Sequence, residues 1–284
     1  MFVDEEQVYR LARLAGLTPP RHAWIEDAAA TFEPHEAVVV KGLGEGLWHK
    51  SEAGAVAFVE AARVEDVAAA MRARVEAAGH RWIGALVCEQ IDIAKVDGLP
   101  TEAFVSVAER QGIWTVMFGL GGVRAEALAQ LAPPLLWPVA WVSPEEALVE
   151  LEDHFLGQTW LGRLRGTRAL TTEAKLETLL RALWSLAERA AADGLRLVEM
   201  NPVVLDGQGT PRVLDGVGAR AHEAVATVPV ARPPAFLSAL VAPRRIAIAG
   251  VSARADSPGH VIAQNLAQAD LAITCIIVKP EAET

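Results

Sequence analysis

The sequence predicts an α+β domain with helices packed against a sheet, followed by a short α/β unit. Over residues 1–225, segments with helical periodicity alternate with short runs rich in β-branched and aromatic side chains. The apolar segment Thr227 to Pro243 then holds four prolines, too many for a continuous helix or a central strand. A strand, a glycine-containing turn, a helix and a second strand follow from Arg245 to Val278, which is the order of a βαβ unit. We therefore predict a domain over residues 1–225, a proline-rich linker over 226–243 and a partial α/β segment over 244–284.

Three helices are predicted from apolar residues spaced three and four apart. The first begins at Asp4, which makes a capping-box-like start with Gln7, and it ends at Gly16. The second runs from about Glu65 to Ala78 and the third from about Thr172 to Ala192, and a glycine follows each of them closely. Their apolar faces are suited to cover a sheet.

Short β-rich runs between the helices predict strands. They are Val38 to Lys41, Trp82 to Cys88, Ala103 to Ala108, Ile113 to Phe118, Arg196 to Met200 and Arg212 to Leu214. The last two flank the turn Asp206 to Gly209, so we expect a hairpin there. Cys88 and Cys275 lie in apolar, strand-like runs without the spacing of a metal site, which predicts buried thiols in a reducing compartment.

Composition is typical of a soluble enzyme. The chain has 284 residues, is 52% hydrophobic and carries a formal charge of −10. An acidic protein lacks the basic face that binds nucleic acid, so we expect no nucleic-acid partner. The amino terminus is acidic where a signal peptide would be basic, and three prolines break the apolar run Leu131 to Val142. We therefore expect a cytoplasmic protein without a membrane segment.

The most informative pattern places Lys41 at the end of an apolar strand and the sequence His49-Lys50-Ser51 just beyond it. A lysine ammonium is a point charge suited to nucleotide phosphates, and a neutral imidazole can attack phosphorus to form a covalent intermediate. Each residue alone has a plainer explanation, since strand-end lysines are usually solvated and most histidines are packed or exposed. Together they indicate a site for phosphoryl transfer.

Five motifs, in one order, resemble the ATP-grasp half of ADP-forming acyl-CoA synthetases (acetate–CoA ligases), relatives of succinyl-CoA synthetase. They are EEQVYRLARLAGLTPP, VVVKGLGEGLWHKSEAGAV, TVMFGLGGVRAEAL, LGRLRG and LVEMNPVVLDGQGTPRVLDGVGAR. The resemblance implies an ATP-grasp fold over residues 1–225, in which two α+β subdomains close on ATP, and the activity of an acid–thiol ligase. The motifs IAIAGVS and IVKP resemble the start of the family's CoA-binding domain, which implies a partial Rossmann-like βαβ unit over residues 244–284.

The resemblance also implies roles for individual residues. Lys41 would bind the phosphates of ATP or ADP, and His49 would carry the phosphoryl group. Asn201 and Asp215 would bind Mg²⁺, although Asn-Pro and Asp-Gly are also common turn dipeptides. Further ATP-binding candidates are Glu89, Glu102, Gly121 and Gly122, and weaker CoA-binding candidates are Gly250, Ser252 and Gly259.

In this family, an acyl phosphate formed at a separate CoA-ligase site gives its phosphoryl group to a histidine, and a histidine of the ATP-grasp half carries it to ADP. The resemblance therefore implies ATP or ADP and Mg²⁺ as cofactors, with CoA as a substrate of the complete enzyme. It also implies CoA-ligase domains as partners, in trans or in a longer natural chain, within a homo- or hetero-oligomer. The activated acid stays open because its pocket would lie in those domains.

Two residues depart from the family pattern. Ala55 replaces the second glycine of the histidine loop, and Thr101 replaces the arginine that precedes Glu102. They leave a second hypothesis open, in which a degenerate ATP-grasp module regulates or scaffolds an acyl-CoA-handling or protein-acetyltransferase assembly. Retention of the lysine, the histidine and both metal candidates favours the phosphoryl-transfer hypothesis.

Overall fold

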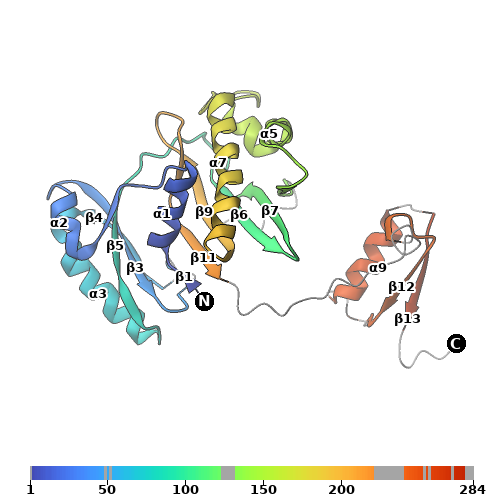
Figure 1. The fold of residues 1–284 in the computed structure, drawn as a ribbon, viewed down its shortest axis with the longest axis horizontal. Coiled ribbons are helices and arrows are strands. Elements are labelled where there is room, and N and C mark those ends of the chain that lie inside the picture. Colours follow the sequence, from blue (N-terminus) through green and yellow to red (C-terminus); the bar gives the residue numbers. More distant parts are fainter. Residues whose placement is uncertain are drawn as a thin grey trace. The chain divides into compact units, whose positions relative to one another are not determined.

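The computed structural model describes residues 2–47, 50, 53–122, 132–220, 240–251, 254, 257–269 and 272–278. They divide into two compact units, Met1–Ala224 and Val225–Thr284, which are described separately (Figure 1). The first unit holds two sheets, and the second unit holds a sheet of two strands. Most of the linker predicted over 226–243 lies outside the described residues, so its conformation stays a prediction.

One sheet of the first unit has four antiparallel strands in the order β2-β5-β3-β4. The strands are β2 (His22–Trp24), β3 (Ala37–Gly44), β4 (Val56–Glu60) and β5 (Trp82–Glu89). One face is covered by α2 (Ala28–Thr31), α3 (Val64–Ala77) and two short 3-10 turns, Ile25–Asp27 and Ala61–Arg63. Because side chains alternate along a strand, Val38 and Val40 pack under these helices while Val39 and Lys41 face the other side.

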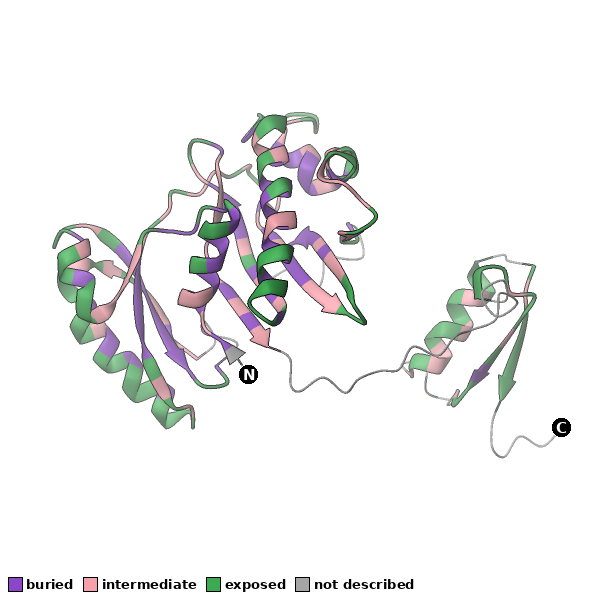
Figure 2. Ribbon diagram, viewed as in Figure 1, coloured by how far each residue is buried: buried purple, intermediate pink, exposed green. Residues whose placement is uncertain are grey.

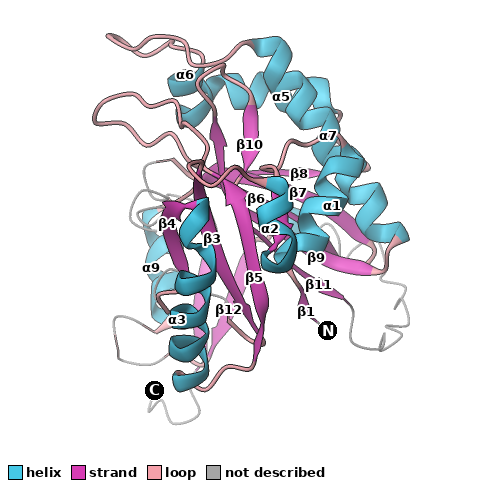
Figure 3. Cartoon of the chain, turned by 90° about the vertical axis from the view of Figure 1, so that its left-hand side faces the viewer, coloured by secondary structure: helices cyan, strands magenta, loops and turns pink. Residues whose placement is uncertain are grey.

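The other sheet has seven strands, six of them in the order β1-β11-β9-β6-β7-β8, with β10 also paired to β9. They are β1 (Phe2–Val3), β6 (Ala103–Arg110), β7 (Ile113–Leu120), β8 (Leu135–Pro138), β9 (Leu195–Leu205), β10 (Pro211–Val213) and β11 (Gly216–Arg220). The helices of this part are α1 (Glu5–Ala15), α5 (Pro144–Asp153), α6 (Phe155–Trp160) and α7 (Glu173–Ala192). Figure 3 shows α1 and α7 side by side, where both pack against the sheet.

The core of this sheet lies beneath the helices. Val198 and Met200 of β9 and Leu180 and Leu183 of α7 are all fully buried in one cluster. Figure 2 shows the same buried layer along the inner strands, with the exposed residues of the helices on the outside. Burial of such side chains stabilises the fold by about 1.5 to 3 kcal/mol each.

The three predicted helices are confirmed. The Asp4 side chain accepts a hydrogen bond from the backbone N–H of Gln7 at 3.0 Å, which caps the first turn of α1. Gly16 ends the same helix with a φ of 94°, a conformation that favours glycine. The predicted second and third helices correspond to α3 and α7.

The region around the predicted hairpin differs from expectation. β9 does not end at Met200 but continues through Asn201 and Pro202, whose peptide bond is cis. β10 pairs with Val203 to Leu205, in the far half of β9, and not with the predicted strand Arg196 to Met200. β11, which was not predicted, pairs with that near half instead. Asn201 and Asp215 therefore lie in the middle of the sheet and not at its end. The ladder continues there because the N–H of Leu214 donates to the carbonyl of Pro202 at 3.0 Å.

Besides β11, the elements β1, β2, β4, β8, α2, α5 and α6 were not predicted. Prolines in the segment before α5 had suggested only a broken apolar run. β8 pairs with β7 at the edge of the sheet, where a proline such as Pro138 is tolerated because its missing N–H breaks no ladder. Ser143 and Glu146 form a capping box at the start of α5, a signal that is visible in the sequence. None of the described helices is long and apolar enough to cross a membrane.

The second unit contains the expected βαβ order. β12 (Arg245–Ala249) and β13 (Thr274–Val278) are parallel neighbours, and α9 (Pro258–Gln268) connects them. Every residue of β13 is exposed (Figure 2), and this includes Cys275. The prediction that Cys275 is buried is therefore wrong, because two strands and one helix leave the sheet uncovered within the described part of this unit.

Candidate functional site

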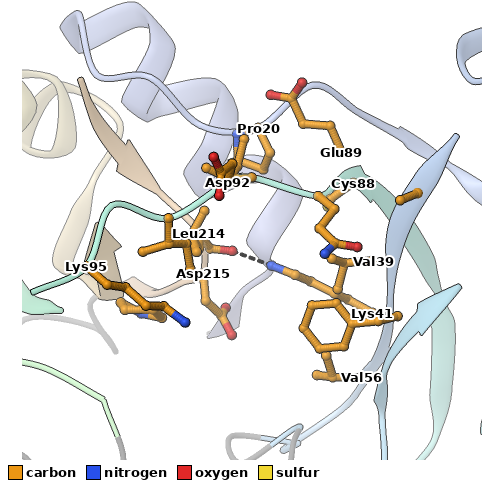
Figure 4. A pocket seen from close by; sticks show the side chains of 16 residues that line it. Pro20, Val39, Lys41, Val56, Cys88, Glu89, Asp92, Lys95, Leu214 and Asp215 are labelled. Atoms are coloured by element: carbon orange, nitrogen blue, oxygen red, sulfur yellow. Dashed lines mark hydrogen bonds between the residues drawn. The ribbon is translucent and has the colours of Figure 1, made fainter. Parts of the chain in front are cut away.

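A pocket of about 800 Å³ opens between residues of the two sheets in the first unit (Figure 4). Its lining comes from β3, β4 and β5 of the four-stranded sheet, from the segments before β2 and after β5, from β9, and from the connection between β10 and β11. The lining residues are Pro20, Ala37, Val39, Lys41, Val56, Phe58, Cys88, Glu89, Gln90, Ile91, Asp92, Ile93, Lys95, Pro202, Leu214 and Asp215. This volume lies within the range of about 300 to 1,000 Å³ that is typical of small-molecule sites.

Lys41 is held in place by groups from the opposite sheet. Its ammonium donates hydrogen bonds to Glu5 Oε1 at 2.6 Å, to the Tyr9 hydroxyl at 2.9 Å and to the carbonyl of Leu214. Figure 4 shows the side chain extending from β3 toward Leu214 and Asp215. The plainer explanation of Lys41 as a solvated strand end therefore does not apply, since only 7% of the residue is exposed.

Lys50 is a second buried lysine in the same cluster. It lies in the connection between β3 and β4, and its ammonium contacts Glu5 Oε2 and, at 2.5 Å, Asp215 Oδ1. Glu5 thus accepts both lysines, one on each carboxylate oxygen, and Lys50 joins Glu5 to Asp215. Two cations and two anions thus alternate in a chain of ion pairs, Lys41–Glu5–Lys50–Asp215, beside the pocket.

The four charged groups shift one another's pKa values. Burial opposes ionisation of Glu5, but the charges of Lys41 and Lys50 outweigh it and lower its pKa to about 2. Burial also opposes the charged forms of the two lysines, yet Glu5 raises the pKa of both. Burial and then the Glu5 charge raise the pKa of Asp215 to about 6, although Lys50 acts in the opposite direction. Asp215 is therefore the group of the cluster that titrates nearest to neutral pH.

The metal candidates are neighbours. The backbone N–H of Asn201 donates to the carbonyl of Asp215 at 3.2 Å, and Asn201 Oδ1 accepts from the Gly122 N–H at 3.1 Å. An amide oxygen and a carboxylate are the hard donors that Mg²⁺ takes from one or two side chains, with phosphates and water completing the shell. The described residues contain no group of three or more His, Cys, Asp and Glu suited to a metal. Two oxygen ligands still fit a magnesium ion that is shared with a nucleotide.

Glu102, Gly121 and Gly122 lie together beside Asn201 but do not line this pocket. The N–H of Gly121 donates to the Glu102 carbonyl at 2.8 Å, and a Cβ on Gly121 would approach the backbone of Ala103 to 2.5 Å. Gly121 is thus required for close packing of the chain against β6. Phosphate binding by Gly121 stays a prediction.

Glu89 lines the pocket, but its carboxylate is already engaged. Glu89 Oε1 accepts from the backbone N–H of Arg21 at 3.0 Å and forms an ion pair with Arg212, which also contacts Asp206. The residue therefore connects β5 to the other sheet. A bond from Glu89 to a ribose would compete with Arg212.

The remaining candidate residues lie either outside the described residues or in the second unit. His49 and Ser252 lie outside the described residues. Gly250 follows β12 with a φ of 78°, and Gly259 lies in the first turn of α9, where a Cβ would come within 3.1 Å of Val251. Both belong to the second unit and stay CoA-binding predictions. Cys88 lines the pocket, and burial raises its pKa to about 12, so its thiol is poorly reactive.

Sequence reasoning missed Glu5, Tyr9 and Lys50. Glu5 and Tyr9 are spaced four apart on α1, on the same buried face as Val8 and Ala12. The Tyr9 hydroxyl donates to Glu5 Oε1 at 2.5 Å. An acidic residue on the apolar face of an amphipathic helix was the available signal, because a buried carboxylate requires a cation from elsewhere in the chain.

The chain is similar to known proteins in both sequence and fold. A family model described as an ATP-grasp domain matches residues 4–217. No curated protein matches the sequence. The dinucleotide forming acetyl-coenzyme A synthetase 1 of Ca. Korarchaeum cryptofilum, in complex with coenzyme A and Ca-AMPCP, is 18% identical with a TM-score of 0.61, covering 78% of this chain and 93% of that chain.

Two further structures share the fold. PH1788 from Pyrococcus horikoshii Ot3 is 16% identical with a TM-score of 0.63, over 78% of this chain and 92% of that chain. A Mg-AMPPCP complex of the Korarchaeum synthetase, with its phosphohistidine segment pointing towards the nucleotide binding site, is 18% identical with a TM-score of 0.56, over 78% and 93%. The family match and the fold confirm the predicted resemblance to the ATP-grasp half of acyl-CoA synthetases. This chain belongs to the ATP-grasp family, and residues 4–217 form its ATP-grasp domain.

Proposed function

We propose that residues 4–217 bind a magnesium complex of ATP or ADP and pass a phosphoryl group between the nucleotide and His49. The chain would thereby serve as the nucleotide half of an ADP-forming acyl-CoA synthetase. The observation that carries the proposal is the pocket of about 800 Å³ that both sheets line, with Lys41 and Asp215 in its wall. The similar fold of the Korarchaeum synthetase, which was solved with Mg-AMPPCP and coenzyme A, supports the choice of ligand.

Lys41 would bind the nucleotide phosphates. Its ammonium is fully charged and fixed by Glu5, Tyr9 and the carbonyl of Leu214 at the pocket wall. A phosphate oxygen can replace one of these acceptors without leaving the cation unpaired. The lysine thus needs little reorganisation when a nucleotide enters, which favours binding.

Asn201 and Asp215 would hold the metal ion. When bound, Mg²⁺ neutralises charge on the phosphate oxygens during transfer. Asp215 lines the pocket with Lys41, and the hydrogen bond between the Asn201 N–H and the Asp215 carbonyl keeps the two ligands adjacent. Their side chains provide the oxygen donors for this ion.

His49 would be the phosphoryl carrier. An imidazole nitrogen attacks the terminal phosphorus of ATP, a P–N bond forms, and the bond to the bridging oxygen breaks to release ADP. The reverse sequence makes ATP from phosphohistidine and ADP. His49 precedes Lys50, whose ammonium is anchored on Glu5 and Asp215 next to Lys41, and this position in the sequence supports the choice of His49 as the carrier.

Acyl transfer would take place on CoA-ligase domains, in trans or in a longer natural chain. Those domains would convert an acyl-CoA and phosphate to an acyl phosphate and free CoA. Transfer of its phosphoryl group toward His49 would then release the free carboxylate. The glycines of the second unit, Gly250 and Gly259, would belong to the CoA-binding part of this assembly.

The two departures from the family pattern leave the lysine cluster intact. Ala55 is fully buried, and its N–H donates to the Lys50 carbonyl at 2.8 Å, so the extra methyl group fits in the core. Thr101 is buried, and its carbonyl accepts from the Trp160 indole at 3.0 Å. Neither substitution removes a group that the proposed reaction needs, which supports an active module over a purely regulatory one.

Isothermal titration calorimetry tests the binding step. The protein is expected to bind ADP in a magnesium-dependent manner, and Lys41→Met is expected to weaken binding at least about tenfold, because a charge-assisted bond to phosphate is lost. Lys175→Met is a matched control, since this lysine donates to the Gln208 carbonyl outside the pocket. Equal affinities for the wild type and Lys41→Met would remove Lys41 from the site, and absence of ADP binding would refute the proposed function.

A further inference from the structure

Lys50 already contacts one carboxylate oxygen of Asp215, a proposed metal ligand. Its ammonium lies 2.5 Å from Asp215 Oδ1, and only 5% of its side chain is exposed. A magnesium ion bound to the same oxygen would lie about 2.0 to 2.1 Å from it. Two cations on one carboxylate repel each other, and the repulsion is stronger where little water screens it. The contact between Lys50 and Asp215 therefore opposes binding of a metal ion there.

The structure provides a place for Lys50 to go. Its ammonium already contacts Glu5 Oε2, and the Glu5 side chain is fully buried. Glu5 carries the second lysine, Lys41, on its other oxygen at 2.6 Å. Lys50 can thus release Asp215 and remain paired with Glu5, which avoids the several kcal/mol that an unpaired buried charge costs.

We infer that Lys50 and a divalent cation compete for the carboxylate of Asp215, so that Lys50 sets how tightly the site binds metal in the absence of nucleotide. The inference rests on the proposed function, because it takes Asp215 as a metal ligand. It adds a positioning role for Lys50, which acts on the metal through Asp215.

The charges of the cluster explain why nucleotide would change the competition. Glu5, Asp215, Lys41 and Lys50 sum to zero when all are ionised. A divalent cation alone would bring this buried group to a net charge of +2, which is unfavourable away from water. Nucleotide phosphates supply the missing negative charge beside Lys41. Metal and nucleotide are therefore expected to bind together far better than metal alone.

The competition also affects the segment that carries the proposed phosphoryl carrier. Lys50 directly follows His49, so their Cα atoms lie about 3.8 Å apart. The ion pair between Lys50 and Asp215 restrains the Lys50 side chain, and a metal ion on Asp215 would weaken it. Metal binding would therefore act on the residue that directly follows the proposed carrier in the sequence.

Mn²⁺ binding without nucleotide tests the inference. Mn²⁺ prefers the same oxygen ligands as Mg²⁺, and electron paramagnetic resonance measures the free ion. Lys50→Met is expected to bind Mn²⁺ about tenfold more tightly than the wild type, because the competing cation is gone. Lys50→Arg keeps the charge and is expected to stay close to wild type. Lys175→Met, which removes a lysine outside the pocket, is expected to change the affinity less than about twofold.

The possible outcomes separate this inference from the proposed function. Unchanged or weaker Mn²⁺ binding by Lys50→Met would overturn the competition, while magnesium-dependent ADP binding would still support the proposed site. Absence of Mn²⁺ binding by every variant, with ADP present, would overturn both. Lys50→Gln, which retains a donor for Glu5, provides the same comparison if Lys50→Met does not fold, and circular dichroism checks the fold of each variant.

Discussion

The two sheets of the first unit contribute opposite charges to the pocket. The four-stranded sheet brings Lys41 on β3, and its β3–β4 connection brings Lys50. The other side brings Glu5 on α1, which packs against β11, and Asp215, which precedes β11. Each lysine is paired with a carboxylate from across the boundary and not from its own sheet. The site is complete only when both sheets are in place.

Because lysines from one side are paired with carboxylates from the other, the pocket differs from a cavity lined by unpaired charges. Its cations already have partners, so ligand binding replaces one set of ionic contacts with another. The anions of a nucleotide would take over the lysines, and a metal ion would take over Asp215. Such an exchange keeps buried charges paired at every stage, which limits its cost. It also makes the carboxylates important for stability as well as for function.

Removal of Glu5 is expected to produce the largest loss of stability. Glu5→Ala leaves Lys41 without a carboxylate in a buried position, which costs about 3 to 5 kcal/mol. Glu6→Ala is a matched control in the same first turn, where the loss of helix-dipole stabilisation costs only about 0.3 to 1 kcal/mol. Urea unfolding at neutral pH measures both. A cost for Glu5→Ala within about 1 kcal/mol of the control would contradict the pairing across the two sheets.

The substitution Asp215→Asn is expected to have a smaller effect on the free energy of unfolding, and this effect depends on pH. Its pKa rises from an ordinary value of 3.8 to about 6 in the folded state, so the folded protein holds a proton that the unfolded chain has released. This contribution to stability is complete below pH 3.8 and is lost as the pH rises through 6. The stability of the wild type relative to Asp215→Asn should thus fall by about 1 to 3 kcal/mol between pH 4 and pH 7.

Urea unfolding of both proteins at several pH values measures this difference. Glu5 acts in the opposite direction, since its pKa is lowered from 4.5 to about 2 and its contribution is lost only as the pH falls through that range. The effect of Asp215 on stability therefore occurs between pH 3.8 and about 6, and that of Glu5 between pH 4.5 and about 2. A difference between wild type and Asp215→Asn that stays constant or grows with pH would contradict the raised pKa of Asp215 beside Glu5.

Much of the fold could be predicted because its signals are local. The caps of α1 and the periodicity of α7 depend on residues within a few turns of each other, and both helices were placed correctly. β11 escaped prediction because Gly216 to Arg220 is short, rich in glycine and becomes a strand only through pairing with β9. Cys275 appeared buried because an apolar strand implies a cover, which the described part of the second unit lacks.

The candidate site could be predicted only in part, for a related reason. Lys41 and Asp215 stand in recognisable motifs, and the structure places both in one pocket. The contacts that organise them join residues far apart in the chain, such as Glu5 with Lys50. An ion pair of that kind leaves no spacing pattern in a single sequence. Only the ion pairs of the folded chain reveal Glu5 as the common partner of both lysines.

The most direct test of phosphoryl transfer is to locate phosphate on the protein after incubation with Mg·ATP, with and without CoA-ligase domains. The account predicts an acid-labile, base-stable phosphate at His49, identified by mass spectrometry. His49→Ala is expected to retain ADP binding and to take up no phosphate, because the nucleophile is absent. Nucleotide binding without phosphate at His49, even with competent CoA-ligase domains present, would contradict the transfer reaction and favour a regulatory module.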